Sequence, residues 1–301
     1  MKVYLAAPRG FCAGVDRAIE IVEIALRRFG APVYVKHQIV HNAHVVRTLE
    51  SKGAVTVEDV RDIPEGSNVV FSAHGSPPED FAVARERGLN VIDATCPLVV
   101  KVHNEAKKYR GEGRDVILVG HRGHQEVKGT MGQAPMFFLD DRDGVELPQW
   151  DADAPVAVLT QTTLSVDDTR RSVEAIRRRF GNAVVRDDIC YATTNRQEAV
   201  KALCDRVDLV LVVGSESSSN CNRLREVAEA SGAAAYLIAG REELDPAWLR
   251  GVEAVGVTSG ASTPDHLVHE LLDALEPIEV EIVQTAEESV SFRLPRGLPE
   301  A

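Results

Sequence analysis

The chain has 301 residues, of which 34 are lysine or arginine and 46 are aspartate or glutamate, giving a formal net charge of −12. A chain of this length can bury a large hydrophobic core and is long enough for two or three domains. The negative charge argues against a general nucleic-acid-binding surface, so we expect no nucleic-acid partner and expect local donors to hold any anionic ligand. No apolar run reaches the length of a membrane span, so we expect no membrane association.

The five cysteines are odd in number and widely spaced. The apolar run after Met1 and Lys2 is too short for a signal peptide and is interrupted by Arg9 and Gly10, so we expect a cytoplasmic protein. In that compartment a disulfide framework is disfavoured. Reduced, metal-binding or catalytic cysteines are favoured instead.

Three of the cysteines, Cys12, Cys96 and Cys190, stand at the same kind of position along the chain. Each follows a short apolar strand and a turn, and each is followed by a helical pattern. A cysteine at the start of a helix has its thiolate favoured by the helix dipole and by free backbone N–H groups. The three are separated by 84 and 94 residues, and this near-equal spacing predicts an internal threefold repeat.

Two polar loops follow each cysteine at similar distances. The first loops contain His41, His124 and Ser218, which lie 29, 28 and 28 residues after Cys12, Cys96 and Cys190. The second loops contain His74, Thr162 and Ser262, which lie 62, 66 and 72 residues after the same cysteines. We therefore expect each repeat to point one cysteine and two polar loops at a common centre.

The predicted fold is α/β, with three similar modules of small, mostly parallel sheets arranged as a pseudo-threefold trefoil. Continuous apolar strands such as 69–71 and 209–213 are typical of buried parallel sheets. The expected modules are 1–95 with Cys12, 96–187 with Cys96, and 188–277 with Cys190. Alternating apolar residues in 278–301 predict a C-terminal β arm.

In the first module, His41 lies in a histidine-rich loop and His74 follows a buried strand. The carboxyl ends of strands are where open α/β sheets bind ligands. Each histidine taken singly is equally consistent with a structural role in capping its loop.

The second module has a glycine-rich loop at 120–130 that contains His121, His124 and Glu126. This composition predicts a loop that closely approaches a charged ligand. It superficially suggests zinc, but a helical zinc motif has its histidines four apart with the glutamate between them, and this loop does not. Glu126 is also consistent with a simple capping role.

The third module contains a loop of serine and asparagine, 214–223, between a buried strand and an amphipathic helix. Hydroxyls, amides and bare N–H groups at a helix N-terminus predict an anion-binding cradle, typically for phosphate. Cys221 lies beside this cradle and is ambiguous, although packing is favoured. Cys204 lies within the preceding helical pattern and is most simply a core residue.

Three equivalent cysteines without a fourth indicate an iron–sulfur cluster in which one iron is not held by cysteine. Electron carriers usually close all four positions with thiolates. An open iron can instead bind a substrate oxygen as a Lewis acid and pass electrons to it.

Four stretches resemble one family closely: 8–18, 93–99, 188–197 and the 120–132 loop. They are similar to the LytB family of 4-hydroxy-3-methylbut-2-enyl diphosphate reductases, and the similarity extends from the start of the chain to about Leu275. The family reductively dehydroxylates its allylic diphosphate to isopentenyl and dimethylallyl diphosphates, the last step of the methylerythritol phosphate route to isoprenoids. The resemblance implies this oxidoreductase activity.

The resemblance also implies a trefoil around a central 4Fe–4S cluster on Cys12, Cys96 and Cys190, with flavodoxin or ferredoxin as electron donor. Glu126, Thr162 and His124 are the implied catalytic residues; Glu126 supplies protons, and Thr162 helps to order the substrate hydroxyl and water. The positions implied to bind the substrate, mainly through its diphosphate, are His41, His74, His124, Thr162, Ser218, Ser219, Asn220 and Ser262. Cys221 departs from the commonest pattern, where a serine or another small residue is expected.

Two other classes of protein remain as alternatives. A non-catalytic metal-binding scaffold would use the cysteines structurally, and a colourless protein containing zinc would favour it. A cysteine hydrolase would need a Cys–His pair, but three equivalent cysteines give no reason to single out one nucleophile.

Overall fold

A computed structural model of the chain describes residues 1–186, 188–296 and 298. Asp187, which ends the second predicted module, and residues 297 and 299–301 of the predicted C-terminal arm lie outside the described residues. Within the described part, none of the helices is both long enough and apolar enough to cross a membrane.

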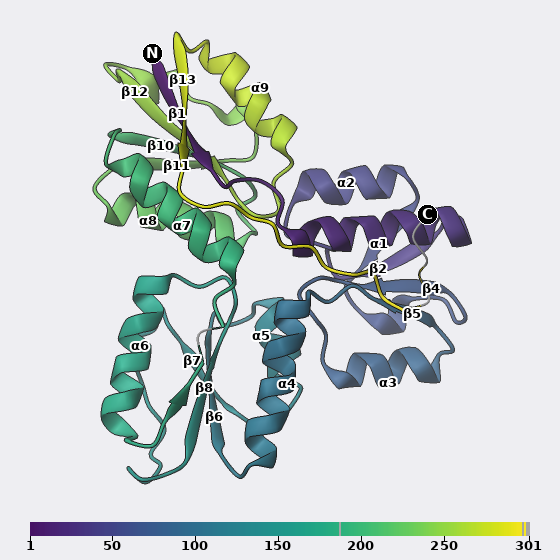
Figure 1. The fold of residues 1–301 in the computed structure, drawn as a ribbon. Coiled ribbons are helices and arrows are strands. Elements are labelled where there is room, and N and C mark those ends of the chain that lie inside the picture. Colours follow the sequence, from purple (N-terminus) through teal and green to yellow (C-terminus); the bar gives the residue numbers. More distant parts are fainter. Residues whose placement is uncertain (187, 297, 299–301) are drawn as a thin grey trace. The chain divides into compact units, whose positions relative to one another are not determined.

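Helices and strands alternate along the chain (Figure 1). The strands are β1 (Lys2–Ala7), β2 (Val33–Lys36), β3 (Ala54–Val57), β4 (Asn68–Phe71), β5 (Asn90–Asp93), β6 (Asp115–Gly120), β7 (Phe137–Asp140), β8 (Val156–Thr160), β9 (Val184–Val185), β10 (Leu209–Val213), β11 (Ala234–Ile238), β12 (Ala254–Ser259) and β13 (Glu279–Gln284). The helices are α1 (Ala13–Phe29), α2 (Ala43–Ser51), α3 (Pro78–Glu86), α4 (Pro97–Gly111), α5 (Gln125–Met131), α6 (Val166–Arg179), α7 (Tyr191–Cys204), α8 (Ser219–Ala230) and α9 (Asp265–Leu275), with short 3₁₀ helices η1 (Val60–Asp62), η2 (Arg241–Glu243) and η3 (Pro246–Leu249).

The described strands form three sheets, and all of their pairings are parallel. The orders are β3-β2-β4-β5, β7-β6-β8-β9 and β11-β10-β12-β1-β13. In the first two of these sheets the second strand flanks the first, and the third and fourth follow on the other side. In the third sheet β10, β11 and β12 have the same order, and β1 and β13 follow β12. This repeated order confirms the predicted α/β class with three small parallel sheets.

The repeat differs in phase from the one expected, because β1 does not lie in the first sheet. β1 pairs with β12 on one side and with β13 on the other, so it completes the sheet of the third module. The expectation that strand 3–5 and Cys12 belong to one module with His41 and His74 is therefore wrong for the strand. A strand and the helix that follows it look like one unit in the sequence. Here the strand before Cys12 instead belongs to the sheet of the third module. The module boundaries themselves stay a prediction.

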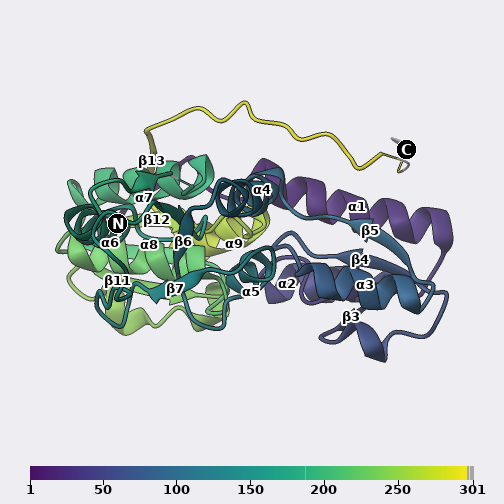
Figure 2. The ribbon, with the colours of Figure 1, turned by 90° about the horizontal axis from the view of Figure 1, so that it is seen from below.

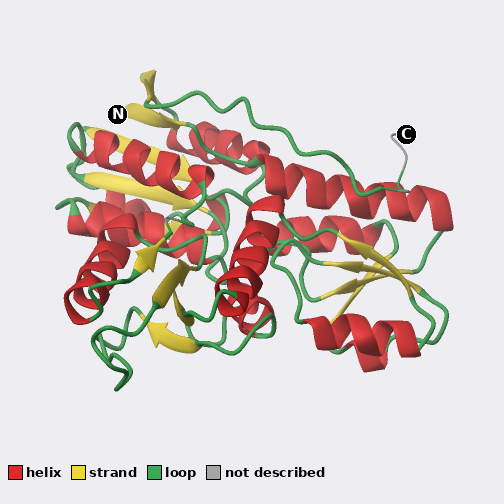
Figure 3. Cartoon of the chain, turned by 60° about the horizontal axis from the view of Figure 1, so that its bottom comes forward, coloured by secondary structure: helices red, strands yellow, loops and turns green. Residues whose placement is uncertain are grey.

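Helices cover both faces of the sheet that contains β1, because its strands are apolar on both sides. Leu203 of α7 and Leu224 of α8 pack in the core on one face. Leu271 of α9 packs in the core on the other. The β6–β8 sheet is enclosed in the same way by α4 and α5 on one face and by α6 on the other (Figure 3).

Contacts along the chain define two compact units. Unit 1 consists of Met1–Val15, His41–Val45 and Tyr191–Ser291, and contains the β1 sheet. Unit 2 consists of Asp16–Val40, Val46–Cys190 and Phe292–Ala301, and contains the other two sheets.

The C-terminal segment forms only half of the predicted β arm. The alternation that includes Val280 and Ile282 corresponds to β13, which adds to the edge of the sheet beside β1. The second alternation, at Val290, Phe292 and Leu294, has no strand and lies in an extended segment without regular structure (Figure 2). Alternation predicts a strand only where a partner edge offers backbone hydrogen bonds.

Candidate functional site

Each of the three repeated cysteines is the residue immediately before a helix: Cys12 before α1, Cys96 before α4 and Cys190 before α7. The backbone N–H of each cysteine donates to a carbonyl in one of the three second polar loops, those that contain Ser262, His74 and Thr162. These bonds are Cys12 N to Ala261 O at 3.2 Å, Cys96 N to Ala73 O at 3.0 Å and Cys190 N to Thr162 O at 3.0 Å. The same local geometry recurs three times, as the spacing predicted.

The thiols suit an iron–sulfur group chemically. All five cysteines are among the described residues, and none forms a disulfide there. Cys12, Cys96 and Cys190 are partly exposed at helix N-termini, where thiolate is favoured. Surrounding protein raises the pKa of the Cys12 thiol by desolvation, whereas the Val15 N–H and the Arg196 charge lower it. Each of these thiols taken by itself has the donor chemistry that an iron–sulfur cluster requires.

The other two cysteines differ from these three in position and surroundings. Cys221 is fully buried in a hydrophobic core, and burial raises the pKa of its thiol. A Cβ atom on Gly214 or Gly260 would lie 2.2 Å from the Cys221 sulfur, so the thiol fills the space that both glycines leave. Cys204 packs against the same core. Both residues therefore serve packing, which the sequence favoured.

In unit 1 the serine-rich loop forms the N-terminus of α8. Ser218 is the N-cap, and its Oγ accepts the Cys221 N–H at 3.3 Å, which leaves the hydroxyl proton available to another acceptor. Ser219 begins the helix, and the first N–H groups of a helix have no partner within it. Asn220 is buried, and its Oδ1 accepts the Ala261 N–H at 3.0 Å. Oriented N–H and hydroxyl donors therefore gather here, as an anion cradle requires.

Ser262 and His41 adjoin this cradle within unit 1. Asn220 anchors the loop of Ser262 through Ala261, and the Ser262 hydroxyl donates to the carbonyl of His41 at 3.1 Å. His41 precedes Asn42, whose buried side-chain oxygen accepts the N–H groups of His44 and Val45 at the start of α2. Four of the predicted binding residues, His41, Ser218, Asn220 and Ser262, are thus tied into connected loops.

The arginines beside these loops are already paired with carboxylates. Arg9 lies 3.1 Å from Asp265, and Arg223 at the start of α8 lies 2.7 Å from Glu226. Fully buried Arg196 of α7 lies 2.9 Å from Glu288. The charges of these three arginines are therefore compensated within the chain.

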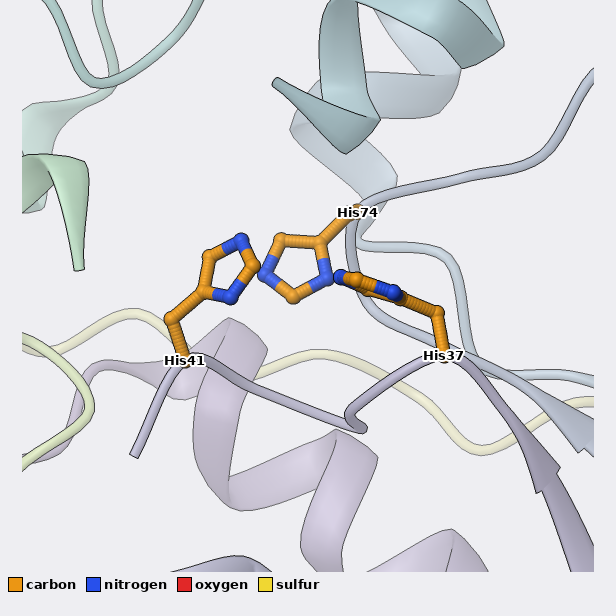
Figure 4. Close-up of side chains that lie close together, drawn as sticks. All are labelled: His37, His41 and His74. Carbon is orange, nitrogen blue, oxygen red and sulfur yellow. The ribbon is translucent and has the colours of Figure 1, made fainter. Parts of the chain in front are cut away.

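In unit 2 the imidazoles of three histidines lie in succession. The His37 and His74 rings meet edge to face with centroids 5.8 Å apart (Figure 4). His74 meets His124 in the same way at 6.1 Å. His124 is the N-cap of α5, and its Nδ1 accepts the Glu126 N–H at 3.2 Å. Since Nδ1 is the acceptor in this bond, a neutral His124 ring carries its proton on Nε2.

Glu126 of α5 is bound on both carboxylate oxygens by one residue, Thr162. The Thr162 N–H donates to Oε1 at 2.7 Å, and the Thr162 hydroxyl donates to Oε2 at 2.9 Å. The carbonyl of Thr162 accepts the N–H of Cys190, so one threonine connects the acid to a predicted cluster ligand. Both Glu126 and Thr162 are buried.

Burial raises the pKa of Glu126 to about 7. The two hydrogen bonds from Thr162 favour the ionised carboxylate and lower the pKa, but burial outweighs them. Nearby Asp188 raises it further. A carboxyl group with such a pKa is protonated in a substantial fraction near neutral pH and can act as a general acid. The prediction that Glu126 could supply protons therefore has a physical basis in its burial.

Two positioning features were missed by the sequence analysis. Asp188 was noted only within a motif, yet it is buried and binds Lys101 at 3.1 Å. The Arg196–Glu288 pair joins a helix to the C-terminal segment, and Arg196 also donates to the carbonyl of Gly10 at 2.8 Å. An isolated charged residue gives no sequence signal for such a distant partner.

A sequence model described as LytB protein matches residues 3–276. The chain belongs to the LytB family. Its relatives include the 4-hydroxy-3-methylbut-2-enyl diphosphate reductase of Zymomonas mobilis, 52% identical, with 99% of this chain and 90% of that protein covered. The reductase of the same name from Mycolicibacterium paratuberculosis is 53% identical, with 100% and 93% covered.

Solved structures agree with this LytB assignment. The E-1-hydroxy-2-methyl-but-2-enyl-4-diphosphate reductase of Plasmodium falciparum has a TM-score of 0.94 and 38% identity, with 98% of this chain and 96% of that chain covered. A second structure, of (E)-4-hydroxy-3-methyl-but-2-enyl diphosphate reductase, has a TM-score of 0.65 and 34% identity, with 91% and 99% covered.

Proposed function

We propose that this LytB chain is an iron–sulfur oxidoreductase that converts 4-hydroxy-3-methylbut-2-enyl diphosphate into isopentenyl and dimethylallyl diphosphates. This is the last step of the methylerythritol phosphate, or non-mevalonate, isoprenoid pathway. One observation carries the chemistry: the buried acid Glu126 is bound by Thr162, and Thr162 is bound in turn by Cys190. A proton donor and a metal-ligating thiol are thereby held by a single residue.

Cys12, Cys96 and Cys190 would hold a 4Fe–4S cluster through their thiolates. The proposal rests on their shared position before a helix and on the backbone bond that each makes to a second polar loop. When bound, the cluster supplies electrons and one iron without a cysteine ligand, which can act as a Lewis acid.

The reaction consumes two electrons and two protons for each substrate. The carbon–oxygen bond to the substrate hydroxyl breaks, the hydroxyl leaves as water with one proton, and the allylic carbon skeleton receives the other proton together with the electron pair. Flavodoxin or ferredoxin is the proposed source of the electrons. The chain's own residues must therefore position the hydroxyl and deliver protons.

Glu126 and Thr162 can deliver the proton that the leaving oxygen needs. With the Thr162 N–H fixed on Oε1, an added proton sits on Oε2 and donates to the Thr162 hydroxyl oxygen. The threonine hydroxyl is then released to donate to the substrate oxygen. A proton can thus pass from Glu126 through Thr162 without movement of either backbone. His124, as the cap of α5, holds Glu126 in place.

The diphosphate is proposed to bind to neutral and imidazole donors. These are His41, His74, His124, Ser218, Ser219, Asn220 and Ser262, with Thr162 at the hydroxyl end of the substrate. The compensated charges of Arg9, Arg196 and Arg223 support this choice. Hydrogen bonds to a charged group are stronger than those between neutral groups, so such donors suffice for an anion.

Anaerobic purification with iron and sulfide analysis tests the proposal directly. We expect a brown protein that converts the substrate when reduced, and we expect serine at Cys12, Cys96 or Cys190 to remove iron and activity together. Cys204→Ser is the matched control and should keep both. A colourless protein that contains zinc would instead support a structural metal site, and a requirement for Cys204 in iron binding would contradict the threefold repeat.

A further inference from the structure

A pocket of about 310 Å³ opens in unit 2 between α3 and α4. We call it the α3–α4 pocket; the residues that matter for its chemistry are Ser76, Arg85, Thr95, His103, Asn104 and Lys107. Ser76, Thr95 and His103 are buried, with exposures of 2%, 5% and 7%, whereas Arg85, Asn104 and Lys107 are exposed. Buried polar groups therefore lie beside two exposed cations, Arg85 and Lys107. None of the residues proposed to bind the substrate lines it.

The two cations at the rim lack acidic partners. The other cations of α4 are each close to a carboxylate: Lys101 to Asp188 at 3.1 Å, Lys108 to Glu112 at 3.9 Å and Arg110 to Asp115 at 2.7 Å. Among the described residues, neither Lys107 nor Arg85 is within ion-pair distance of a carboxylate. In a chain with a net charge of −12, two uncompensated cations at one pocket are a local positive site.

Two buried polar atoms of the pocket residues also lack partners. The Ser76 hydroxyl oxygen and His103 Nε2 make no hydrogen bond to any described residue. Leaving a buried polar group unsatisfied costs about 1–3 kcal/mol, so native proteins rarely retain one without a reason. A ligand that accepts hydrogen bonds would satisfy the serine hydroxyl.

One acidic residue, Asp93, also lines the pocket and opposes an anion there. Its carboxylate is already engaged, because Oδ1 accepts the Thr95 N–H at 2.9 Å and also the Thr95 hydroxyl. Its charge further interacts with Arg17. The charges of Arg85 and Lys107 therefore outweigh that of Asp93 in the pocket.

We infer that the α3–α4 pocket binds a small phosphate-type oxyanion. Arg85 and Lys107 supply the charge, and the Ser76 hydroxyl and the Asn104 amide supply neutral donors. The planar guanidinium of Arg can donate two parallel hydrogen bonds to two oxygens of one phosphate.

The α3–α4 pocket adjoins the loop that contains His74, since Ser76 of this loop lines it. Gly75 has φ of +82°, and a Cβ atom there would lie 2.7 Å from Cε1 of His103, so the imidazole packs against the loop backbone. Burial and the charge of Lys107 lower the pKa of His103 to about 4. An anion beside Lys107 would therefore favour the protonated imidazole and raise this pKa.

Calorimetric titration of inorganic phosphate into the purified holoprotein tests the site. The variant Arg85→Ala/Lys107→Ala removes the charges of the pocket, and Asn220→Ala disrupts the proposed substrate cradle. Arg178→Ala, which changes an exposed arginine on α6, is the matched control. We expect phosphate affinity to fall roughly tenfold or more in the pocket variant, since each lost bond to a charged group costs that much. Phosphate affinity should be retained in Asn220→Ala and in Arg178→Ala.

Three results would overturn the inference: no phosphate binding, loss of binding only in Asn220→Ala, or unchanged binding in the pocket variant. Unfolding temperature and iron content, measured on the same samples, establish that the exposed substitutions leave the fold intact. Titration with a phosphomonoester and with pyrophosphate distinguishes free phosphate from a phosphorylated metabolite as the better ligand. Turnover of the wild type is measured separately, so an active protein without phosphate binding contradicts only this inference.

Discussion

Thr162 donates two hydrogen bonds to Glu126, one from its backbone and one from its hydroxyl, at 2.7 and 2.9 Å. The two residues are 36 positions apart: Glu126 lies in the first turn of α5, and Thr162 lies in the loop after β8. Two donors on one buried carboxylate would normally keep it ionised, but burial opposes them and raises the pKa to about 7. The proposed acid is therefore held rigidly and still able to carry a proton.

Replacing Glu126 by glutamine tests this acid. The amide keeps the size and can still accept the Thr162 N–H, but it has no proton to give. We expect normal iron content and near-normal substrate binding, with turnover lower by roughly 10²–10⁴-fold, the usual contribution of a general acid. Glu174→Gln, an exposed change on α6, is the control. A Glu126→Gln variant that keeps most of its turnover with saturating reductant would assign the acid to another group.

The pH dependence of turnover should follow the same carboxyl group. The protonated form is the active one, so we expect turnover to fall as pH rises through about 7, the pKa of Glu126. Asp188 raises this pKa by its negative charge, so Asp188→Asn should move the falling limb to lower pH. A pH–rate profile measured for wild type and variant checks both statements. A profile that is flat through neutral pH would contradict them.

Stability should depend on pH in the same direction. The ordinary pKa of glutamate is 4.5, so the folded state binds more protons than the unfolded state between 4.5 and about 7. The contribution of Glu126 to the free energy of unfolding is therefore complete below 4.5 and is lost as pH rises through about 7. Denaturant titrations of wild type and Glu126→Gln at several pH values should show a larger loss in the wild type, because Asp188, whose pKa is raised to about 6, titrates in both proteins.

The cradle at α8 should account for part of the substrate affinity. Ser218→Ala or Asn220→Ala should each weaken substrate binding by roughly 1–3 kcal/mol, the value of a hydrogen bond to a charged group. Ser217→Ala, which changes an exposed serine in the same loop, is the control. Calorimetry without reductant measures binding apart from turnover. Unchanged affinity in both cradle variants would place the diphosphate elsewhere.

The Arg196–Glu288 pair should stabilise the turn that leads to Cys12. Arg196 is fully buried, and it joins Glu288 to the carbonyl of Gly10. Removing one partner of a buried pair leaves an uncompensated charge and costs roughly 3–5 kcal/mol. We expect Glu288→Gln to lower the unfolding temperature and to speed iron loss during anaerobic dialysis. The neighbouring exposed change, Glu287→Gln, should do neither; equal iron retention in both variants would limit Glu288 to a minor role.

Local patterns in the sequence were sufficient to predict most of the helices and strands. Apolar runs such as Leu209–Val213 predicted buried parallel strands, because every residue on such a strand meets a covered face. The helical pattern directly after Cys96 predicted a cysteine at a helix start, and Pro97 fits the first turn of α4 because proline has no N–H to lose there. Such signals depend only on neighbours along the chain.

Pairings between distant residues were decided only by the tertiary structure. Strand β1 completes the third sheet, since hydrogen bonds between strands depend on where the chain returns and leave no mark on residues 2–7. In the same way, β13 extends only as far as the edge of β1 offers backbone hydrogen bonds to it. The sequence by itself determined three strand–cysteine–helix units and the polar loops between them. Only the fold decided that Thr162 binds Glu126 and that Glu288 binds Arg196, because burial and partnership are properties of the folded chain.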